Sequence, residues 1–292
     1  MSETVSYQDD ELARSDGEGL QVHCEGLVHI YRVEGNDVVA LRGVDLDVDA
    51  GERVALLGPS GSGKSTLVNL VGGLLRPSAG RLAVGPHDVG KMTERQLLGM
   101  RARSVGMVLQ GAARNLLPFA TAEENVRFAQ RALPRSARRS VLSPERLLDE
   151  LGMGGLAKAR LAGLAGGEQH RVAVAVGVAN GPGVLLADEP TSQLDAPDRE
   201  SVLGLLETVN QRFGTTVLLV THDPEVGHRL GRTVTMRGGR VGSEGRRGEQ
   251  FAVVAKDGSL HLPEDLLEEW PPGTLVRFHR DETGLRLSRE AE

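Results

Sequence analysis

The chain has 292 residues, of which 39% are hydrophobic and 25% charged, and its net charge is −6. This length suits one large domain or a domain with an appendage, and the composition excludes wholesale disorder. The acidic balance and the 3% aromatic content disfavour a general nucleic-acid-binding surface, which needs basic groups and stacking side chains. One cysteine, Cys24, excludes an internal disulfide and a multi-cysteine zinc site, so we expect a reducing compartment such as the cytoplasm.

The negative charge is concentrated at the two ends of the sequence. Residues 1–20 contain six acidic residues and one arginine and lack an apolar run, which predicts a disordered acidic tail and not a signal peptide. Residues 250–292 have a net charge of −4, so the part between the ends is mildly basic. No apolar run approaches the roughly 20 residues that a membrane-spanning helix needs, so we expect no span.

Four short apolar segments predict buried parallel strands, at residues 53–57, 104–109, 184–187 and 216–221. Helix-compatible stretches separate them, one of which spans roughly residues 121–151. This alternation predicts an α/β fold with a parallel sheet. The glycine-rich, charged segment 238–250 predicts a linker, which we place at residues 244–250.

A glycine-rich motif follows the first predicted strand and matches the phosphate-binding pattern G-x-x-x-x-G-K-[ST]. It consists of Gly58, Pro59, Ser60, Gly61, Ser62, Gly63, Lys64, Ser65 and Thr66. Glycines let backbone N–H groups face phosphate oxygens, and the following helix directs its positive end at the anion. Lys64 would hold the outer phosphates, and the Ser65 hydroxyl would bind Mg²⁺. A ligand-free turn is the alternative, and the order strand, loop, helix disfavours it.

Polar side chains follow the three other predicted strands. Asp188 ends one strand and suits a carboxylate that holds Mg²⁺, whereas Glu189 suits a general base for water in line with the γ-phosphate. His222 closes the next strand, where it would sense the γ-phosphate or hold the attacking water. Gln110 follows the strand at 104–109 and would contact Mg²⁺ and water. Each residue alone is compatible with a structural role, but the phosphate loop makes ATP hydrolysis the favoured interpretation.

The order of these motifs resembles the ATP-binding subunit of ABC transporters. The resemblance covers about residues 21–243 and includes LAGGEQHR at 164–171 and SQLD at 192–195. It implies a P-loop NTPase fold of ABC type, with a parallel core sheet, an antiparallel β subdomain and a helical subdomain at about residues 111–180. It also implies ATP and Mg²⁺ as cofactors and a head-to-tail pair, formed by two copies or by this chain and a paralogous ATPase subunit.

The same resemblance implies a nucleotide site that two subunits share. Each ATP would lie between the phosphate loop of one subunit and the signature of the other, which is here Ala165, Gly166, Gly167 and Glu168. Tyr31 falls where the family places an aromatic that stacks on adenine, although a packed strand aromatic is the alternative, and Asp195 would support the contact between subunits. The family usually has serine where this chain has Ala165, so we expect weaker closure or slower turnover, because alanine cannot donate a hydrogen bond.

Finer features resemble the macrolide-export, lipoprotein-release and cell-division branch, notably NLLPFATAEENV after Gln110 and VTHDPEVGHRLGRTVTMRGGRV. That branch implies an ATPase that powers a separate transmembrane permease, for export or envelope remodelling, from the cytoplasmic face of the cell membrane. The alternative is a soluble ATP-dependent switch whose C-terminal region contacts DNA or a protein. A tandem ABC protein of translation is disfavoured because the sequence has one ATP-binding unit.

Residues 251–292 predict a small β-rich appendage. FAVVA and SLHL predict strands, PEDLLEEW a short helix, and TLVRFH with GLRLS a hairpin. This order resembles the AbrB-type swapped-hairpin fold. About 40 residues can hardly bury a core alone, and a swapped dimer would share strands. The net charge of −4 favours dimerisation over DNA binding, and an appendage without a swap is the alternative.

Overall fold

The computed structural model describes residues 18–33, 36–246, 249–254, 258–260, 262, 264–271, 273–281 and 284–289. Residues 1–17 of the predicted acidic tail lie outside these ranges. Leu20, also assigned to that tail, is anchored to the sheet: its N–H donates to the Gly183 carbonyl at 3.0 Å, and its carbonyl accepts from Thr216 Oγ1 at 2.8 Å.

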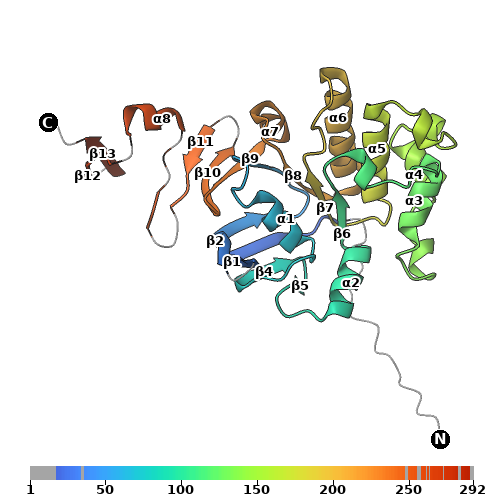
Figure 1. Ribbon diagram of the computed structural model, residues 1–292, viewed down its shortest axis with the longest axis horizontal. Coiled ribbons are helices and arrows are strands. Elements are labelled where there is room, and N and C mark those ends of the chain that lie inside the picture. Colours follow the sequence, from blue (N-terminus) through green and yellow to red (C-terminus); the bar gives the residue numbers. More distant parts are fainter. Residues whose placement is uncertain are drawn as a thin grey trace, which may run out of the picture.

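A seven-stranded sheet forms the centre of the molecule, in the order β11-β10-β9-β3-β8-β7-β6 (Figure 1). Its strands are β3 Arg53–Leu57, β6 Val105–Val108, β7 Val184–Asp188, β8 Thr216–Val220, β9 Arg232–Arg237, β10 Arg240–Arg246 and β11 Glu249–Ala252. Strands β6, β7, β8, β3 and β9 run parallel, and β10 and β11 are antiparallel at one edge. Of the four predicted strands, β3, β8 and β7 are central and β6 forms an edge. The apolar sequences of the central three reflect burial on both faces.

A second, antiparallel sheet has the order β2-β1-β4-β5. Its strands are β1 Val22–Val33, β2 Asn36–Val48, β4 Ala79–Val84 and β5 His87–Asp88. Helix α1, Lys64–Val71, lies between the two sheets in a shared hydrophobic core to which Leu41, Leu56 and Leu67 contribute. This core holds the start of α1 in place, and the candidate phosphate loop ends there.

Helices gather at the β6 side of the central sheet (Figure 1). They are α2 Glu94–Arg103, α3 Ala122–Gln130, α4 Pro144–Glu150, α5 Gly166–Gly177 and α6 Ala196–Phe213, and α7 Pro224–Leu230 packs on β3. The stretch predicted as helix over 121–151 is broken into α3, a short 3-10 turn and α4. Pro134 and Pro144 cause the break, because proline cannot donate to a helical hydrogen bond. None of the helices in the described ranges is long and apolar enough to cross a membrane.

The C-terminal region differs from its prediction at the proposed linker, 244–250. Strand β10 continues to Arg246, and β11 begins at Glu249 and pairs with it. The reason is a contact with a residue outside the segment. Glu244 accepts a hydrogen bond from the buried guanidinium of Arg232 at 2.9 Å, and the same guanidinium donates to Glu52 at 2.8 Å.

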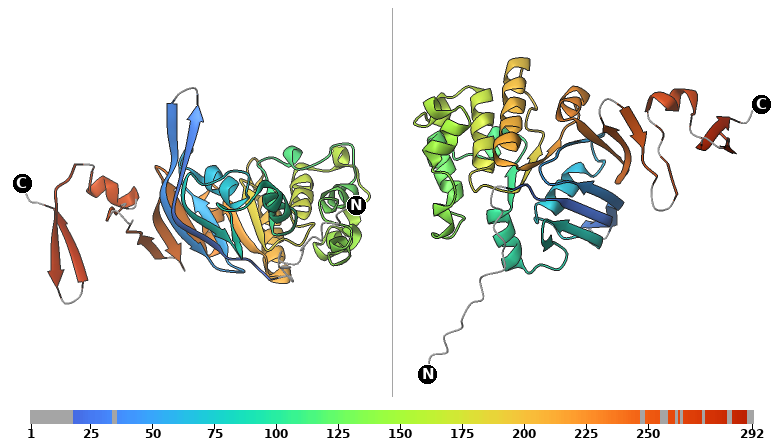
Figure 2. Two further views of the ribbon diagram at one scale, coloured as in Figure 1. Left: turned by 90° about the horizontal axis from the view of Figure 1, so that it is seen from below. Right: turned by 180° about the vertical axis from the view of Figure 1, so that it is seen from behind.

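The rest of the appendage contains α8, Glu264–Glu269, and a hairpin of β12, Val276–Asp281, and β13, Gly284–Arg289. Within SLHL, Leu260 forms an isolated bridge with Val254. The hairpin turn is expected around Arg280–Thr283, of which residues 282–283 lie outside the described residues. Figure 2 shows the hairpin at one end of the molecule, beyond α8. Phe278 and Leu275 are 67% and 69% exposed there.

Candidate functional site

The phosphate loop lies between the end of β3 and the start of α1. Gly58 and Gly63 have φ values of +138° and +100°, which disfavour other residues. Space also requires glycine: a Cβ at Gly58 would lie 2.2 Å from the Met236 carbonyl oxygen, and one at Gly63 would lie 2.8 Å from that of Ala40. The neighbouring strands therefore fix the path of the loop.

The Lys64 ammonium group lies inside this loop. Its Nζ donates to the carbonyls of Gly58 and Pro59, at 2.7 and 2.9 Å. The residue is only 8% exposed, and burial lowers its pKa, against the opposite influence of the Glu189 and Asp188 carboxylates. The loop thus holds a cation at its centre, where phosphate oxygens of a nucleotide would compete with the carbonyls.

Asp188 and Ser65 form a pair of oxygen groups beside the lysine. The Ser65 hydroxyl donates to the Asp188 carboxylate, and burial raises the pKa of Asp188 despite that bond. A hydroxyl and a carboxylate suit Mg²⁺, which takes oxygen ligands and keeps waters and phosphates in its remaining positions. The described residues contain no group of three or more His, Cys, Asp or Glu side chains that would hold a metal by themselves.

Glu189 and His222 meet at the adjoining ends of β7 and β8. His222 Nδ1 lies 2.9 Å from Glu189 Oε1. Glu189 has a φ of +49°, an uncommon value for a residue with a side chain, which costs about 1 kcal/mol or more. Its N–H donates to the Val220 carbonyl at 3.0 Å, which helps to hold this conformation. The strained turn places the carboxylate beside the histidine, past the point where the strand ends.

The other two candidates, Gln110 and Tyr31, have different surroundings. Gln110 is exposed and follows β6, at the same sheet edge as Asp188. The Tyr31 hydroxyl lies 3.2 Å from Thr66 Oγ1, and its ring makes an edge contact with His29 at 4.6 Å between centroids. Tyr31 is therefore next to the loop and packed in its sheet at the same time.

The signature residues form a separate group at the start of α5. The Ala165 N–H donates to Glu168 Oε2 at 2.9 Å, and the α5 helix begins at Gly166. A Cβ at Gly167 would lie 2.1 Å from the Asp198 carboxylate, so this α6 side chain would have to move if another residue replaced the glycine. Asp195 caps α6 by accepting from the Asp198 N–H at 2.9 Å. The predicted signature and Asp195 thus share the α5–α6 contact.

Sequence reasoning missed two residues that position this site. Asn115 accepts from the Leu109 N–H and donates to the Leu109 carbonyl, both at 2.8 Å, and also donates to the Gly111 carbonyl at 3.0 Å. It thereby fixes the chain on each side of Gln110. Arg199 of α6 donates to Asp223 at 3.1 Å, next to His222. Asn115 begins the NLLPFATAEENV stretch quoted above, but that resemblance gave it no role, and Arg199 lies outside the motifs. Each residue acts through a contact that only the fold forms.

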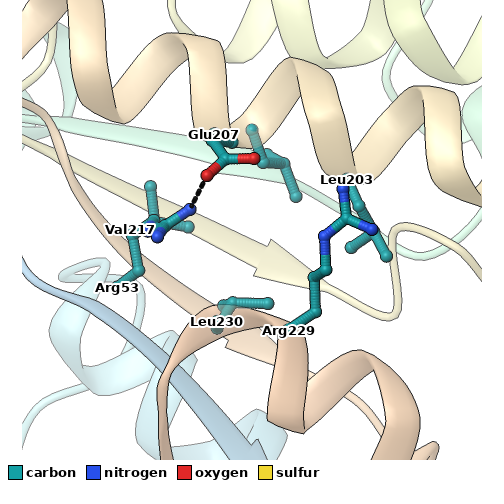
Figure 3. Close-up of a pocket in the computed structure, with 7 residues that line it drawn as sticks. Arg53, Leu203, Glu207, Val217, Arg229 and Leu230 are labelled. Atoms are coloured by element: carbon teal, nitrogen blue, oxygen red, sulfur yellow. Dashed lines mark hydrogen bonds and ion pairs between the residues drawn. The ribbon is translucent and has the colours of Figure 1, made fainter.

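The pocket in Figure 3 lies away from these groups. Side chains of β3, α6, β8 and α7 line it: Arg53, Leu203, Leu206, Glu207, Val217, Arg229 and Leu230. Arg53 donates to Glu207 at 2.9 Å, and Arg229 pairs with Glu200. Both arginines are therefore engaged by carboxylates, and we assign this pocket no ligand.

Three features together define the site of a P-loop ATPase: a buried lysine in a glycine loop, a serine–aspartate pair, and a glutamate–histidine pair at neighbouring strand ends. Comparisons with known proteins narrow this class. Residues 41–192 match the family model described as ABC transporter. The chain is 43% identical over 211 residues to the lipoprotein-releasing system ATP-binding protein LolD of Anaeromyxobacter dehalogenans. This match covers 70% of this chain and 85% of that protein. The chain belongs to the ABC transporter family, as an ATP-binding, ATP-hydrolysing subunit of the branch that includes LolD and MacB.

Two further comparisons describe this relationship. The chain is 41% identical over 224 residues to the macrolide export ATP-binding/permease protein MacB of Rhodopirellula baltica, covering 76% of this chain but only 32% of that protein. A solved dimeric structure of the bacterial ABC transporter cassette MJ0796 matches with a TM-score of 0.66 and 32% identity, over 77% of this chain and 98% of that one. Another structure of that cassette, in a post-hydrolysis state bound to ADP and Pi, matches at 33% identity and the same TM-score.

Proposed function

We propose that this chain hydrolyses ATP to power a separate membrane permease, in export or envelope remodelling, and that the permease holds it at the cytoplasmic face of the membrane. The Glu189–His222 pair beside Asp188 and Ser65 carries the proposal, because these groups serve hydrolysis and not binding alone. The LolD relative supports a separate subunit, since it is named as an ATP-binding protein and is matched over 85% of its length. The MacB relative is named as ATP-binding and permease protein together, and only 32% of it is matched.

We assign each side chain of the site one task. The N–H groups of the phosphate loop and Lys64 hold the phosphates. Ser65, Asp188 and Gln110 hold Mg²⁺, which neutralises charge on the phosphates when bound. Glu189 accepts a proton from the attacking water, and His222 fixes the carboxylate in place and contacts the γ-phosphate. Tyr31 contacts the adenine after its hydroxyl leaves Thr66.

The signature group is assigned to the nucleotide of a second subunit, which is a copy of this chain or a paralogue. In support, residues 165–168 and Asp195 gather at the α5–α6 contact and not in the phosphate loop. The similarity to a cassette whose title describes a dimer supports the same arrangement. With Ala165 in place of serine, backbone N–H groups of Gly166 and Gly167 would carry the contact.

A pull-down from solubilised host membranes tests the permease. The bait is tagged Glu189→Gln chain with MgATP, which traps the ATP-bound pair, and the control bait adds Lys64→Ala to prevent nucleotide binding. Recovery of a multi-span protein in fixed ratio, reduced for the control, supports the proposal. A bait that remains soluble and brings down only itself, DNA or a soluble protein overturns it in favour of the ATP-dependent switch.

We also propose that the C-terminal appendage is an AbrB-like dimerisation unit. An isolated two-stranded hairpin is marginally stable in water, and this one exposes Phe278 and Leu275. The test is the molar mass of the full chain without ATP, measured by analytical ultracentrifugation. We expect a dimer that Phe278→Glu dissociates, whereas Phe128→Glu, at a 53% exposed position on α3, leaves it intact. A wild-type monomer at high concentration contradicts this proposal.

A further inference from the structure

An arginine-rich stretch lies on the helical part of the molecule, outside the ATP site. Residues 125–144 contain five arginines and no acidic residue. Four of these arginines belong to the stretch 131–139, between α3 and α4, which we call the arginine segment. It includes a short 3-10 turn, Ala137–Arg139, and nearly all of it is exposed.

The arginine segment has a defined backbone but unneutralised charge. Arg138 braces it by donating to the carbonyls of Leu133 and Arg131, at 2.9 and 2.8 Å. Arg127, just before the segment, pairs with Glu123 and Glu145. By contrast, no carboxylate in the described part of the chain pairs with Arg131, Arg135 or Arg139. Three exposed guanidinium groups on a braced turn form a surface for an acidic partner.

The loop at 179–183 connects this surface to the place where the described chain begins. Asn180 Nδ2 donates to the Ala102 carbonyl at 2.9 Å, and Gln130, the last residue of α3, donates to the Ala179 carbonyl at 3.0 Å. The same loop receives the Leu20 N–H at the Gly183 carbonyl. The chain at residues 18–20 therefore lies beside the C-terminal end of α3, where the arginine segment starts.

The residues that precede Leu20 have the complementary charge. Residues 1–17 contain five acidic residues, three of them consecutive in Asp9, Asp10 and Glu11, and one arginine. Seventeen residues can extend over at most about 60 Å, so the segment is long enough to cover its neighbour. Tethering gives it an effective concentration on the order of millimolar, so weak ion pairs suffice for docking.

From this juxtaposition we propose that the acidic N-terminal segment, residues 1–17, docks on the arginine segment of the same chain. The docked segment would join two parts of the molecule. Leu20, three residues after the segment, is fixed to the central sheet through Gly183 and Thr216, and the segment itself would lie on the turn that links α3 to α4. The contact is electrostatic and exposed, so it weakens as salt is added.

Cross-linking of the full chain tests this contact. One cysteine replaces Ser6 and a second replaces Ser136, whose side chain makes no capping bond and is exposed. The native Cys24 does not compete, because its thiol is buried and burial raises its pKa to about 12. The matched control pairs Ser6→Cys with Gln211→Cys, an exposed site on the last turn of α6 beside Glu207.

We expect a short bis-maleimide to link Ser6→Cys to Ser136→Cys within one chain, at about tenfold higher yield than the control pair. The yield should fall about tenfold in 1 M salt or with Arg131→Glu, Arg135→Glu and Arg139→Glu combined. Replacing Asp9, Asp10 and Glu11 by lysine in that reversed variant should restore it. Equal yields for the two pairs, a yield that does not depend on salt, or links that form only between two chains would overturn the proposal. The salt series needs no arginine substitution, so a misfolded variant does not affect it.

Discussion

His222 Nδ1 lies 2.9 Å from Glu189 Oε1, although the two residues are 33 positions apart in the sequence. The glutamate side chain is 14% exposed and the histidine side chain 73%. An ionised carboxylate only accepts hydrogen bonds, so Nδ1 is the donor in this pair. The pair thus extends from the sheet edge toward solvent, with the carboxylate on its sheltered side.

Glu189→Gln should abolish most hydrolysis and preserve ATP binding. Glutamine retains the size and an oxygen acceptor for His222 but cannot take a proton from water. We expect turnover to fall roughly 10²–10⁴-fold, measured by phosphate release, with ATP affinity within about threefold of wild type. Glu225→Gln, on the first turn of α7, is the control and should retain activity. Near-normal turnover by Glu189→Gln would remove this residue from the role of base.

His222→Ala should lower turnover by releasing the Glu189 side chain. His222→Gln should recover part of the loss, because its amide can donate to the same carboxylate oxygen. The measurements are turnover number and KM of both variants. Since we assign His222 to positioning and γ-phosphate contact, we expect the main effect on turnover. Equal losses for alanine and glutamine would argue against a role through the hydrogen bond to Glu189.

Lys64→Met should weaken nucleotide binding, because it removes the buried cation and leaves the carbonyls of Gly58 and Pro59 without a donor. A lost charge-assisted bond corresponds to roughly 1.5–3 kcal/mol, so we expect affinity for ATP to fall about 10–150-fold. Calorimetric titration of the folded variant would measure this. Binding as tight as wild type would show that the loop N–H groups hold the phosphates alone.

Ala165→Ser should strengthen ATP-driven pairing. A new hydroxyl donor to a charged phosphate is worth roughly 1.5–3 kcal/mol, or about 10–150-fold in the pairing constant. Sedimentation of the Glu189→Gln background with and without Ala165→Ser gives this constant directly. Ala162→Ser, an exposed site close by, is the matched control and should change nothing. No increase from Ala165→Ser would show that the contact does not use this position.

Acid should remove a stabilising contribution from Glu123 in α3. A hydrogen bond from Lys158, with further help from Arg127, lowers the Glu123 pKa from 4.5 to about 2. Because the folded pKa is the lower one, the stabilisation is complete above about pH 5 and is lost as the pH falls from 4.5 toward 2. We expect Glu123→Gln to reduce the free energy of unfolding by about 1–2 kcal/mol at pH 7.

Urea unfolding at several pH values checks this expectation. The difference between wild type and Glu123→Gln should shrink as the pH is lowered from 6 to 3. Glu200→Gln, in an exposed ion pair with Arg229, is the comparison and should show little effect at any pH. A difference that stays constant with pH would contradict the assignment.

The sequence predicts most of the sheet because the central strands are buried on both faces and read as unbroken apolar runs. It also predicts that Asp188, Glu189 and His222 approach one another, since parallel strands end at one edge. It fails where a distant partner decides the outcome. The segment at 244–250 is glycine-rich and charged, yet Glu244 is held by Arg232, which in turn depends on Glu52, 180 positions away. The sequence around Tyr31 and Asn115 likewise does not reveal the contact of Tyr31 with Thr66 or the hydrogen bonds of Asn115.

The addition of β11 to the central sheet has a mechanical consequence. Four residue pairs join it to β10, from Arg246 and Glu249 near the turn to Ser243 and Ala252 at the far end. Force applied through the appendage acts first on the bond from the Val253 N–H to the Gly242 carbonyl, and then on the Ser243–Ala252 pair and the rest of the ladder. Strand β9 and the phosphate-loop strand β3 lie behind β10. A load on the C-terminal end therefore detaches β11 from β10 before it deforms the ATP site.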